Sequence, residues 1–166
     1  MTMENTSGRD VLTHYGNRET DTQYGGETAG ESGVLRVLEY VFDYDELPAA
    51  GTTNLQMIIP AGAIVTSATF EVITAFTSTS TTTDLTVGIA DADGGATITD
   101  ADAIFTAAEL TQTVIAAAGV RTASSSGAIL NNDVSEAVEI TVTPTVDDLL
   151  TGRARLIVAY QPAYPS

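Results

Sequence analysis

From Gly33 onward the chain is a succession of short runs rich in Val, Ile, Thr and aromatic residues, each ended by Gly, Pro, Asp or Asn. β-Branched and aromatic side chains favour extended backbone, whereas Gly, Pro and Asx residues favour turns. The pattern therefore predicts a fold built almost entirely from strands. We expect these strands at residues 34–44, 54–59, 63–77, 84–90, 128–130, 137–143 and 153–160.

Two of the runs predict more than the presence of a strand. In residues 34–44, apolar side chains occupy both alternating sets of positions, which is typical of a central strand that is covered on both faces. Residues 63–77 make a run longer than an ordinary strand, so a β-bulge is expected near Ser67.

The middle of the chain contains the one predicted helix. In residues 99–110, Thr99 is suited to an N-cap, Asp102 follows three residues later, and Ile104, Phe105 and Ala108 follow at helical spacing. Residues 114–120 fit a helix or a strand equally well. Six to eight short strands with one short helical insertion predict an all-β fold, an antiparallel β-sandwich of jelly-roll type.

Residues 1–33 differ from the rest of the chain because Thr, Gly and Glu dominate them. Such a segment buries too little apolar surface to offset the entropy lost on ordering. We therefore expect an extended N-terminal assembly arm over residues 1–33, held by a neighbouring subunit, and a β-sandwich domain over residues 34–166. The apolar and aromatic residues that could anchor the arm are Val11, Leu12, Tyr15 and Tyr24.

The charge balance excludes two classes of partner. The chain has 22 carboxylates and six basic residues, all arginine, which gives a net charge of −16. This charge repels the phosphates of nucleic acids and the surface of anionic membranes, so we expect neither as a partner. No apolar run reaches the ~20 residues of a membrane span, and the N-terminal residues do not resemble a signal peptide.

The composition also predicts a protein that is not an enzyme and needs no cofactor. There is no Cys, and His14 is the only histidine. Thiolate catalysis, cysteine-ligated metal sites and multi-histidine metal sites are therefore ruled out within one chain, and a Ser-His-Asp arrangement is not expected.

An acidic stretch after the run at residues 84–90 invites comparison with a calcium-binding loop. Counted from Asp91, Asp93 and Asp102 stand at positions 3 and 12 of such a loop. Gly95 at position 5 has no side-chain ligand, and Ala96 stands where the sharp turn needs Gly. We expect the three aspartates to be turn residues rather than metal ligands, with a weak divalent-cation site as the alternative.

Three strand-and-turn motifs carry a family resemblance. They are Ile59-Pro60-Ala61-Gly62-Ala63 between two strands, Val87-Gly88 within a strand, and a final strand with Gly152, Leu156, Val158 and Tyr160 at alternating spacing. With the Thr/Ser-rich loop between the first two, they resemble small β-sandwich structural proteins of tailed-bacteriophage virions. The resemblance covers residues 34–162.

The resemblance implies a capsid decoration (cement) protein that binds the outer surface of a phage head, with the major capsid protein as its partner. Such a protein is made in the host cytoplasm, ends up in the virion and has no catalytic residues. A receptor- or carbohydrate-binding β-sandwich of a phage fibre or tail is the alternative. The absence of Trp disfavours it, since glycan sites commonly use exposed aromatic rings.

The resemblance and the apolar pattern together predict self-association, with a homotrimer as the expected assembly. The two apolar faces of residues 34–44 and the aliphatic final strand suggest more apolar surface than one sandwich buries. Arg153 and Arg155, on one face of that final strand, are the candidates to pair with carboxylates of a neighbouring subunit.

Overall fold

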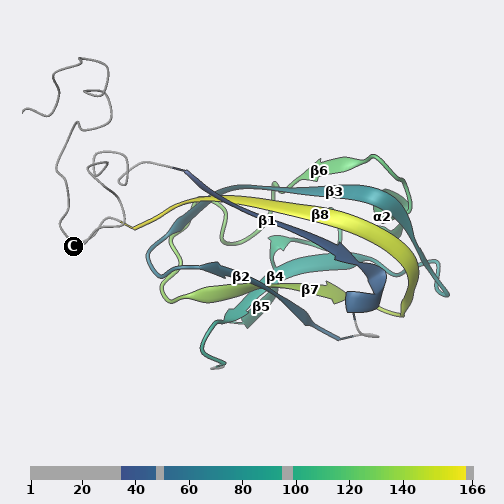
Figure 1. Ribbon diagram of the computed structural model, residues 1–166, viewed down its shortest axis with the longest axis horizontal. Helices are drawn as coiled ribbons and strands as arrows, with labels where there is room; N and C mark the ends of the chain where they lie inside the picture. Colours follow the sequence, from purple (N-terminus) through teal and green to yellow (C-terminus); the bar gives the residue numbers. More distant parts are fainter. Residues whose placement is uncertain (1–34, 48–50, 95–98, 164–166) are drawn as a thin grey trace, which may run out of the picture. The chain divides into compact units, whose positions relative to one another are not determined.

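The computed structural model describes residues 35–47, 51–94 and 99–163, which form two four-stranded antiparallel sheets packed face to face (Figure 1). Sheet A has the strand order β1-β8-β3-β6, and sheet B has the order β2-β7-β4-β5. The strands are β1 (Arg36–Asp43), β2 (Thr53–Ile59), β3 (Ile64–Ser78), β4 (Leu85–Asp91), β5 (Thr99–Phe105), β6 (Arg121–Ala123), β7 (Val138–Pro144) and β8 (Leu149–Gln161). The described residues also contain two short helices, η2 (Tyr44–Glu46) and α2 (Gln112–Ile115).

The chain passes from one sheet to the other at almost every connection. Only β4 and β5 are consecutive strands of the same sheet, and the first and last strands, β1 and β8, are neighbours. Eight strands in two such antiparallel sheets make up a jelly roll. The expected all-β sandwich is therefore confirmed, and within the described residues it contains one short α-helix, α2.

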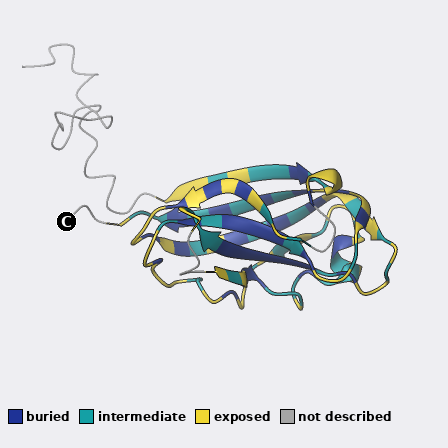
Figure 2. Ribbon diagram, turned by 90° about the horizontal axis from the view of Figure 1, so that it is seen from below, coloured by how far each residue is buried: buried dark blue, intermediate teal, exposed yellow. Residues whose placement is uncertain are grey.

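The core lies between the two sheets, where alternate residues of each strand point inward. Figure 2 shows buried residues running along the strands, while exposed residues gather in the turns and along the outer surfaces. Phe42 on β1 packs edge-on against Phe70 on β3 at a ring-centroid distance of 6.1 Å, and Phe70 packs against Phe105 on β5 at 6.2 Å. These contacts join sheet A to sheet B through aromatic rings.

The bulge expected near Ser67 is present in β3. Val65 and Ser67 pair with consecutive residues of β8, which leaves Thr66 as the extra residue. Because the bulge shifts the alternation by one position, Val65 and Ala68 both point into the core. Without it, one of the two would face solvent.

The motif at residues 59–63 forms the turn that carries the chain from sheet B to sheet A. The Ala63 N–H donates to the Pro60 carbonyl oxygen at 3.2 Å, and Gly62 has a φ of 75°. A positive φ at the third residue of a turn is readily adopted only by glycine and a few polar residues.

The helix predicted over residues 99–110 is wrong. Residues Thr99–Phe105 form strand β5, which pairs with β4 in sheet B. Ala103, Ile104 and Phe105 are all completely buried, a run of three that suits a buried strand rather than one face of a short helix. The α-helix comes later, at α2, which overlaps only the first two residues of the stretch 114–120 where the sequence left helix and strand open.

The central position expected for the first strand is also wrong, because β1 lies at the edge of sheet A. Its inward residues, such as Phe42, are buried, but Val37 on the other face is 60% exposed. Apolar residues occur on both faces of β1, but only the face that points into the core is buried.

Three smaller differences concern strand boundaries. The strand expected at residues 128–130 is a single bridge between Leu130 and Val65, and strand β6 was not foreseen. Strand β8 begins at Leu149, before the expected start at residue 153.

Candidate interaction surface

Four charged residues, one from each strand of sheet A, line up across its outer face. They are Glu39 on β1, Arg155 on β8, Glu71 on β3 and Arg121 on β6, and we call them the charge ladder. Glu71 lies directly opposite Arg155 on one side and opposite Arg121 on the other. Residues opposite each other in antiparallel strands share a face and lie close together, so the register itself brings these charges into contact.

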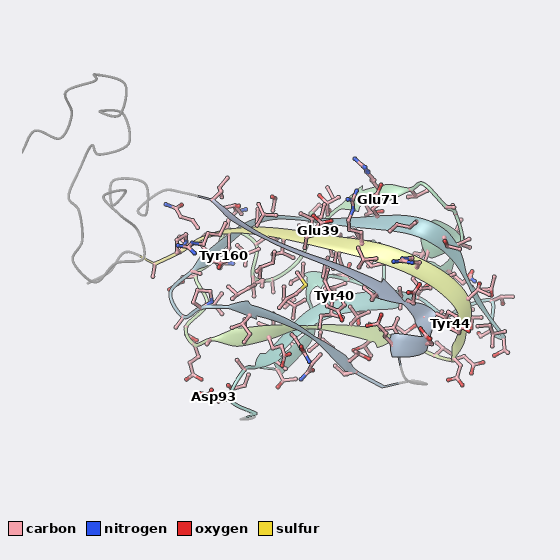
Figure 3. The ribbon with its side chains drawn as sticks, in the orientation of Figure 1. Glu39, Tyr40, Tyr44, Glu71, Asp93 and Tyr160 are labelled. Atoms are coloured by element: carbon pink, nitrogen blue, oxygen red, sulfur yellow. The ribbon has the colours of Figure 1, made fainter. Side chains whose placement is uncertain are left out.

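Glu71 is the centre of the ladder because it accepts from two arginines at once. Its Oε1 accepts from Arg121 Nε at 2.9 Å and forms an ion pair with Arg121 Nη2 at 2.8 Å. Its Oε2 accepts from Arg155 Nε at 2.8 Å and from Arg155 Nη2. Arg155 also donates from Nη1 to Glu39 Oε1 on the neighbouring strand β1, at 3.3 Å. Figure 3 labels Glu39 and Glu71 along this side of sheet A.

These contacts shift the ionisation of the ladder toward the charged forms. Hydrogen bonds from Arg155, and then from Arg121, hold the pKa of Glu71 below its ordinary value. Hydrogen bonds to Glu71 and to Glu39 raise the pKa of Arg155 above its ordinary value. Both shifts favour the charged forms of Glu71 and Arg155 at neutral pH. With two carboxylates and two arginines, the ladder has no formal net charge.

A second ion pair lies beside the ladder on the same face. Arg153 Nε on β8 lies 3.8 Å from Asp43 Oδ1 on β1. Arg153 and Arg155, the arginines expected to pair with a neighbouring subunit, thus both have carboxylate partners within their own sheet. Contacts of either arginine with another subunit remain a prediction.

The outer face of sheet A differs in charge from the rest of the described molecule. The described residues include 16 carboxylates and four arginines. Three carboxylates and three arginines occupy this face (Glu39, Asp43, Glu71, Arg121, Arg153 and Arg155), so it is neutral. The other described surfaces carry the remaining 13 carboxylates with one arginine, Arg36.

Apolar side chains border the charged part of this face. Val37 on β1 is 60% exposed, and Ile73 on β3 is 45% exposed. Ile157 on β8 lies between Glu39 and Thr69 in the register, so its partly exposed side chain shares the same outer face. The exposed apolar side chains of this face thus lie beside charges that already pair within the sheet.

The final strand does not supply the surplus apolar surface expected from its sequence. Leu156 and Val158 are completely buried in the chain's own core, and Tyr160 is nearly so. The expectation that the final strand exposes surplus apolar surface, which was one premise of the trimer prediction, is therefore wrong for β8. The arm residues Val11, Leu12, Tyr15 and Tyr24 lie outside the described residues, so their predicted role in assembly remains a prediction.

The acidic residues lie partly in a turn and partly in a strand. Asp93 lies in the turn after β4, whereas Asp102 lies within β5, so the turn role expected for Asp102 is wrong. Asp91 ends β4, and its Oδ1 accepts from the Asp93 N–H at 3.1 Å, while the Asp102 N–H donates to Asp100 Oδ1 at 3.3 Å. Such bonds are typical of Asx turns. A side-chain hydrogen bond with Asp100, aided by burial, raises the pKa of Asp102 above its ordinary value.

The described ranges contain no group of three His, Cys, Asp or Glu side chains that could hold a metal ion. Gly95 and Ala96 lie outside those ranges. Among these aspartates, the turn role is observed for Asp93. The weak cation site stays a prediction. Asp93 lies near sheet B (Figure 3), away from the charge ladder.

Glu109 is the most strongly hydrogen-bonded carboxylate of the described structure outside the ladder, and its role was missed from the sequence. It accepts from Thr106 N–H at 2.9 Å, from Ser125 N–H at 2.7 Å and from Ser126 N–H at 3.1 Å, and also from the hydroxyls of Thr106 and Ser125. Burial alone would raise the pKa of Glu109, but these hydrogen bonds outweigh it and lower the pKa to about 2. Glu109 thus ties the turn after β5 to the loop after β6.

The charge ladder was also missed, apart from Arg155. The available signal was the presence of Glu39, Glu71 and Arg121 inside or at the start of runs otherwise rich in apolar residues and Thr. A charge within a half-buried strand must face outward, but the sequence does not say which strand lies beside it.

Within the described residues, no helix is long and apolar enough to cross a membrane. No protein-family model matches the chain, and no curated protein matches it in sequence.

Three of the solved structures with a similar fold are chains of phage capsids. A chain of the cyanophage Pam1 capsid asymmetric unit matches with a TM-score of 0.56 and 20% identity, over 79% of this chain and 86% of that one. A chain of the Ralstonia phage GP4 capsid matches with a TM-score of 0.56 and 21% identity, over 81% and 88%. A chain of the acidic stable capsid of Helicobacter pylori bacteriophage KHP30 matches with a TM-score of 0.55 and 21% identity, over 78% and 88%. At this level of identity the likeness establishes a shared fold.

Proposed function

We propose that this chain is a non-enzymatic structural protein of a phage virion, and more specifically a decoration protein on the outer surface of the head. The observation that carries the proposal is the shared fold with chains from three different phage capsids, over at least 86% of the length of each. A jelly roll occurs in proteins of many functional classes, so the fold alone does not indicate a role. What favours a virion role is that these three similar structures are all chains of phage capsids.

The charge distribution supports a role on the outside of a head. A net charge of −16 disfavours contact with packaged nucleic acid, and it keeps copies of the protein soluble before assembly. The absence of Cys allows the chain to fold in the reducing cytoplasm of a host and to keep the same covalent structure in the released virion.

In this proposal the partner is the major capsid protein, and the contacts come from the β-sandwich and the N-terminal arm, residues 1–33. Self-association as a homotrimer is part of the same proposal. Because each copy carries many negative charges, association should strengthen as salt screens the repulsion between copies. Sedimentation at low and at high salt tests this part separately.

The main experiment is a binding assay with heads of the parent phage from which the protein has been removed. We expect purified protein to sediment with these heads in a saturable manner and to raise the temperature at which they lose DNA. Bovine serum albumin, also acidic, serves as a control for nonspecific adsorption.

The same experiment separates the alternative role. A receptor- or carbohydrate-binding module of a fibre or tail should bind host cells or purified surface glycans and leave bare heads unaffected. Saturable binding to cells without binding to heads would favour that role over decoration. Binding to neither would count against both.

A further inference from the structure

We infer that the outer face of sheet A is the docking surface for a second copy of this chain, with Glu39 of one copy opposite Arg121 of the other. The inference concerns pairing of the sandwich with itself. It requires neither a capsid nor the proposed trimer, and a wild type that forms only dimers would support this surface while counting against the trimer.

The first argument is the distribution of charge. Two copies approaching through most of their described surfaces bring clusters of carboxylates together, because 13 of the 16 described carboxylates lie outside this face. The outer face of sheet A carries equal numbers of carboxylates and arginines, and these already pair within each copy. Contact through this face therefore avoids the repulsion that opposes association elsewhere.

The second argument is the order of charges across the sheet. Glu39 lies on the edge strand β1 and Arg121 on the opposite edge strand β6. If two copies stack face to face about a two-fold axis parallel to the strands, β1 of each lies over β6 of the other. In the register Glu39 is level with Ala123, two residues along β6 from Arg121, so an axis tilted slightly from the strand direction brings Glu39 to Arg121 twice in one symmetric interface. A two-fold axis across the strands would instead place β1 over β1 and β6 over β6, which brings like charges toward each other, so the charges favour the first arrangement.

The third argument is that both end residues of the ladder can take another partner. Arg121 contacts Glu71 with Nε and Nη2, and its side chain is 65% exposed. Glu39 contacts Arg155 through Oε1, and its side chain is 51% exposed. Among the described residues, the contacts of Arg121 use Nε and Nη2 and the contact of Glu39 uses Oε1, which leaves Arg121 Nη1 and Glu39 Oε2 for a further partner. Both atoms can therefore form a further ion pair without breaking an existing one.

Apolar contacts complete the surface. Val37 and Ile73 are exposed on the same face, and Ile157 lies between the charged positions of β1 and β3. Burying these side chains against their counterparts would favour association, while the neutralised ladder reduces the cost of desolvating the charges.

The test is sedimentation equilibrium of the full chain over the micromolar range at physiological salt. We compare the wild type with Glu39→Arg, with Arg121→Glu, with the double exchange, and with an equimolar mixture of the two single variants. Glu136→Arg, an exposed change away from this face, matches the change in net charge of Glu39→Arg. Thermal melting by circular dichroism shows that each variant is folded.

We expect the wild type to form dimers and each single variant to weaken dimerisation by about tenfold or more. The mixture should regain wild-type association, because the arginine introduced in one variant then meets the glutamate introduced in the other. Glu136→Arg should associate at least as well as the wild type. The neutral variants Glu39→Gln and Arg121→Gln should weaken dimerisation less than the charge reversals do.

Three results would overturn the inference: a wild type that stays monomeric over this range, a dimer insensitive to both reversals, or a mixture no better than its components. A trimer insensitive to both reversals would support the proposed assembly while overturning this surface.

Discussion

The ring of Phe76 on β3 lies directly against Gly152 on β8, in the space that a β-carbon at Gly152 would occupy. Gly152 also has a φ of 134°, a conformation that residues with a β-carbon rarely adopt. The glycine therefore allows β8 to begin at Leu149 and to pass beneath a buried aromatic ring of the core.

Gly152→Ala should accordingly destabilise the sandwich by about 2–4 kcal/mol, through backbone strain together with overlap with the ring. Gly119→Ala is the matched control, because Gly119 also has a positive φ, of 82°, but an added β-carbon there meets nothing within 4 Å. It should cost only the strain of the backbone, about 1 kcal/mol. Urea denaturation of both variants measures the difference, and equal losses would contradict the role given to Phe76.

Glu109→Gln should destabilise the protein at neutral pH but not in acid. The pKa of Glu109 falls from an ordinary value of 4.5 to about 2 on folding, so its ionised form stabilises the fold above pH 4.5. That contribution is lost as pH falls from 4.5 to 2, and it amounts to at most about 3 kcal/mol.

Urea denaturation of the wild type and Glu109→Gln at neutral pH and at successively lower pH checks this prediction. The gap in free energy of unfolding should narrow as the wild-type carboxylate becomes protonated. Glu136→Gln, a change at an exposed carboxylate, is the control and should show little effect. A gap independent of pH would mean that the hydrogen bonds to Glu109 do not depend on its charge.

Glu71→Gln replaces the carboxylate shared by Arg155 and Arg121 with a neutral amide, which keeps one acceptor oxygen and places an NH2 donor against one of the arginines. We expect a melting temperature a few degrees lower at low salt and a smaller loss at high salt, because salt screens exposed ion pairs. Since the pKa of Glu71 is lowered in the folded protein, its stabilising effect is present above the ordinary carboxylate pKa and is lost as pH falls through the lowered value. An equal loss at low and high salt would argue against an electrostatic contribution.

Removal of residues 1–30 should leave the sandwich folded, because the buried hydrophobic residues of the described structure all lie between Phe42 and Tyr160. The shortened protein should keep its β-rich circular dichroism spectrum and cooperative melting, while losing affinity for heads or for other subunits. Binding at full affinity without these residues would show that they are not an assembly arm.

Calcium should bind no more tightly than the weak extracellular sites, with dissociation constants of about 10⁻⁴–10⁻³ M. Asp91 already accepts a backbone N–H in the turn after β4, and Asp100 accepts one within β5. Isothermal titration of the wild type and Asp93→Ala measures this directly. Micromolar affinity that disappears in the variant would identify a genuine site and favour the receptor-binding alternative.

Most strands could be predicted from the sequence because the information that defines a strand is local. Runs of apolar, β-branched and Thr residues, each ended by turn residues, identified β2, β4 and β7 to within one residue at each end. The bulge at Ser67 followed from the length of its run. The same local reasoning failed at Thr99–Phe105, where a plausible N-cap and helical spacing were outweighed by pairing with β4 and complete burial of the last three residues.

The charge ladder could not be predicted, since it depends on which strands become neighbours. Glu39 and Arg155 are 116 positions apart in the sequence, and Glu71 and Arg155 are 84 apart. Composition and alternation determined by themselves that this acidic, Thr-rich chain forms a sandwich with charges on its outer faces. Only the tertiary structure decided which charges meet, because strand order and register in a jelly roll arise from packing the whole core, to which residues distant in sequence contribute together.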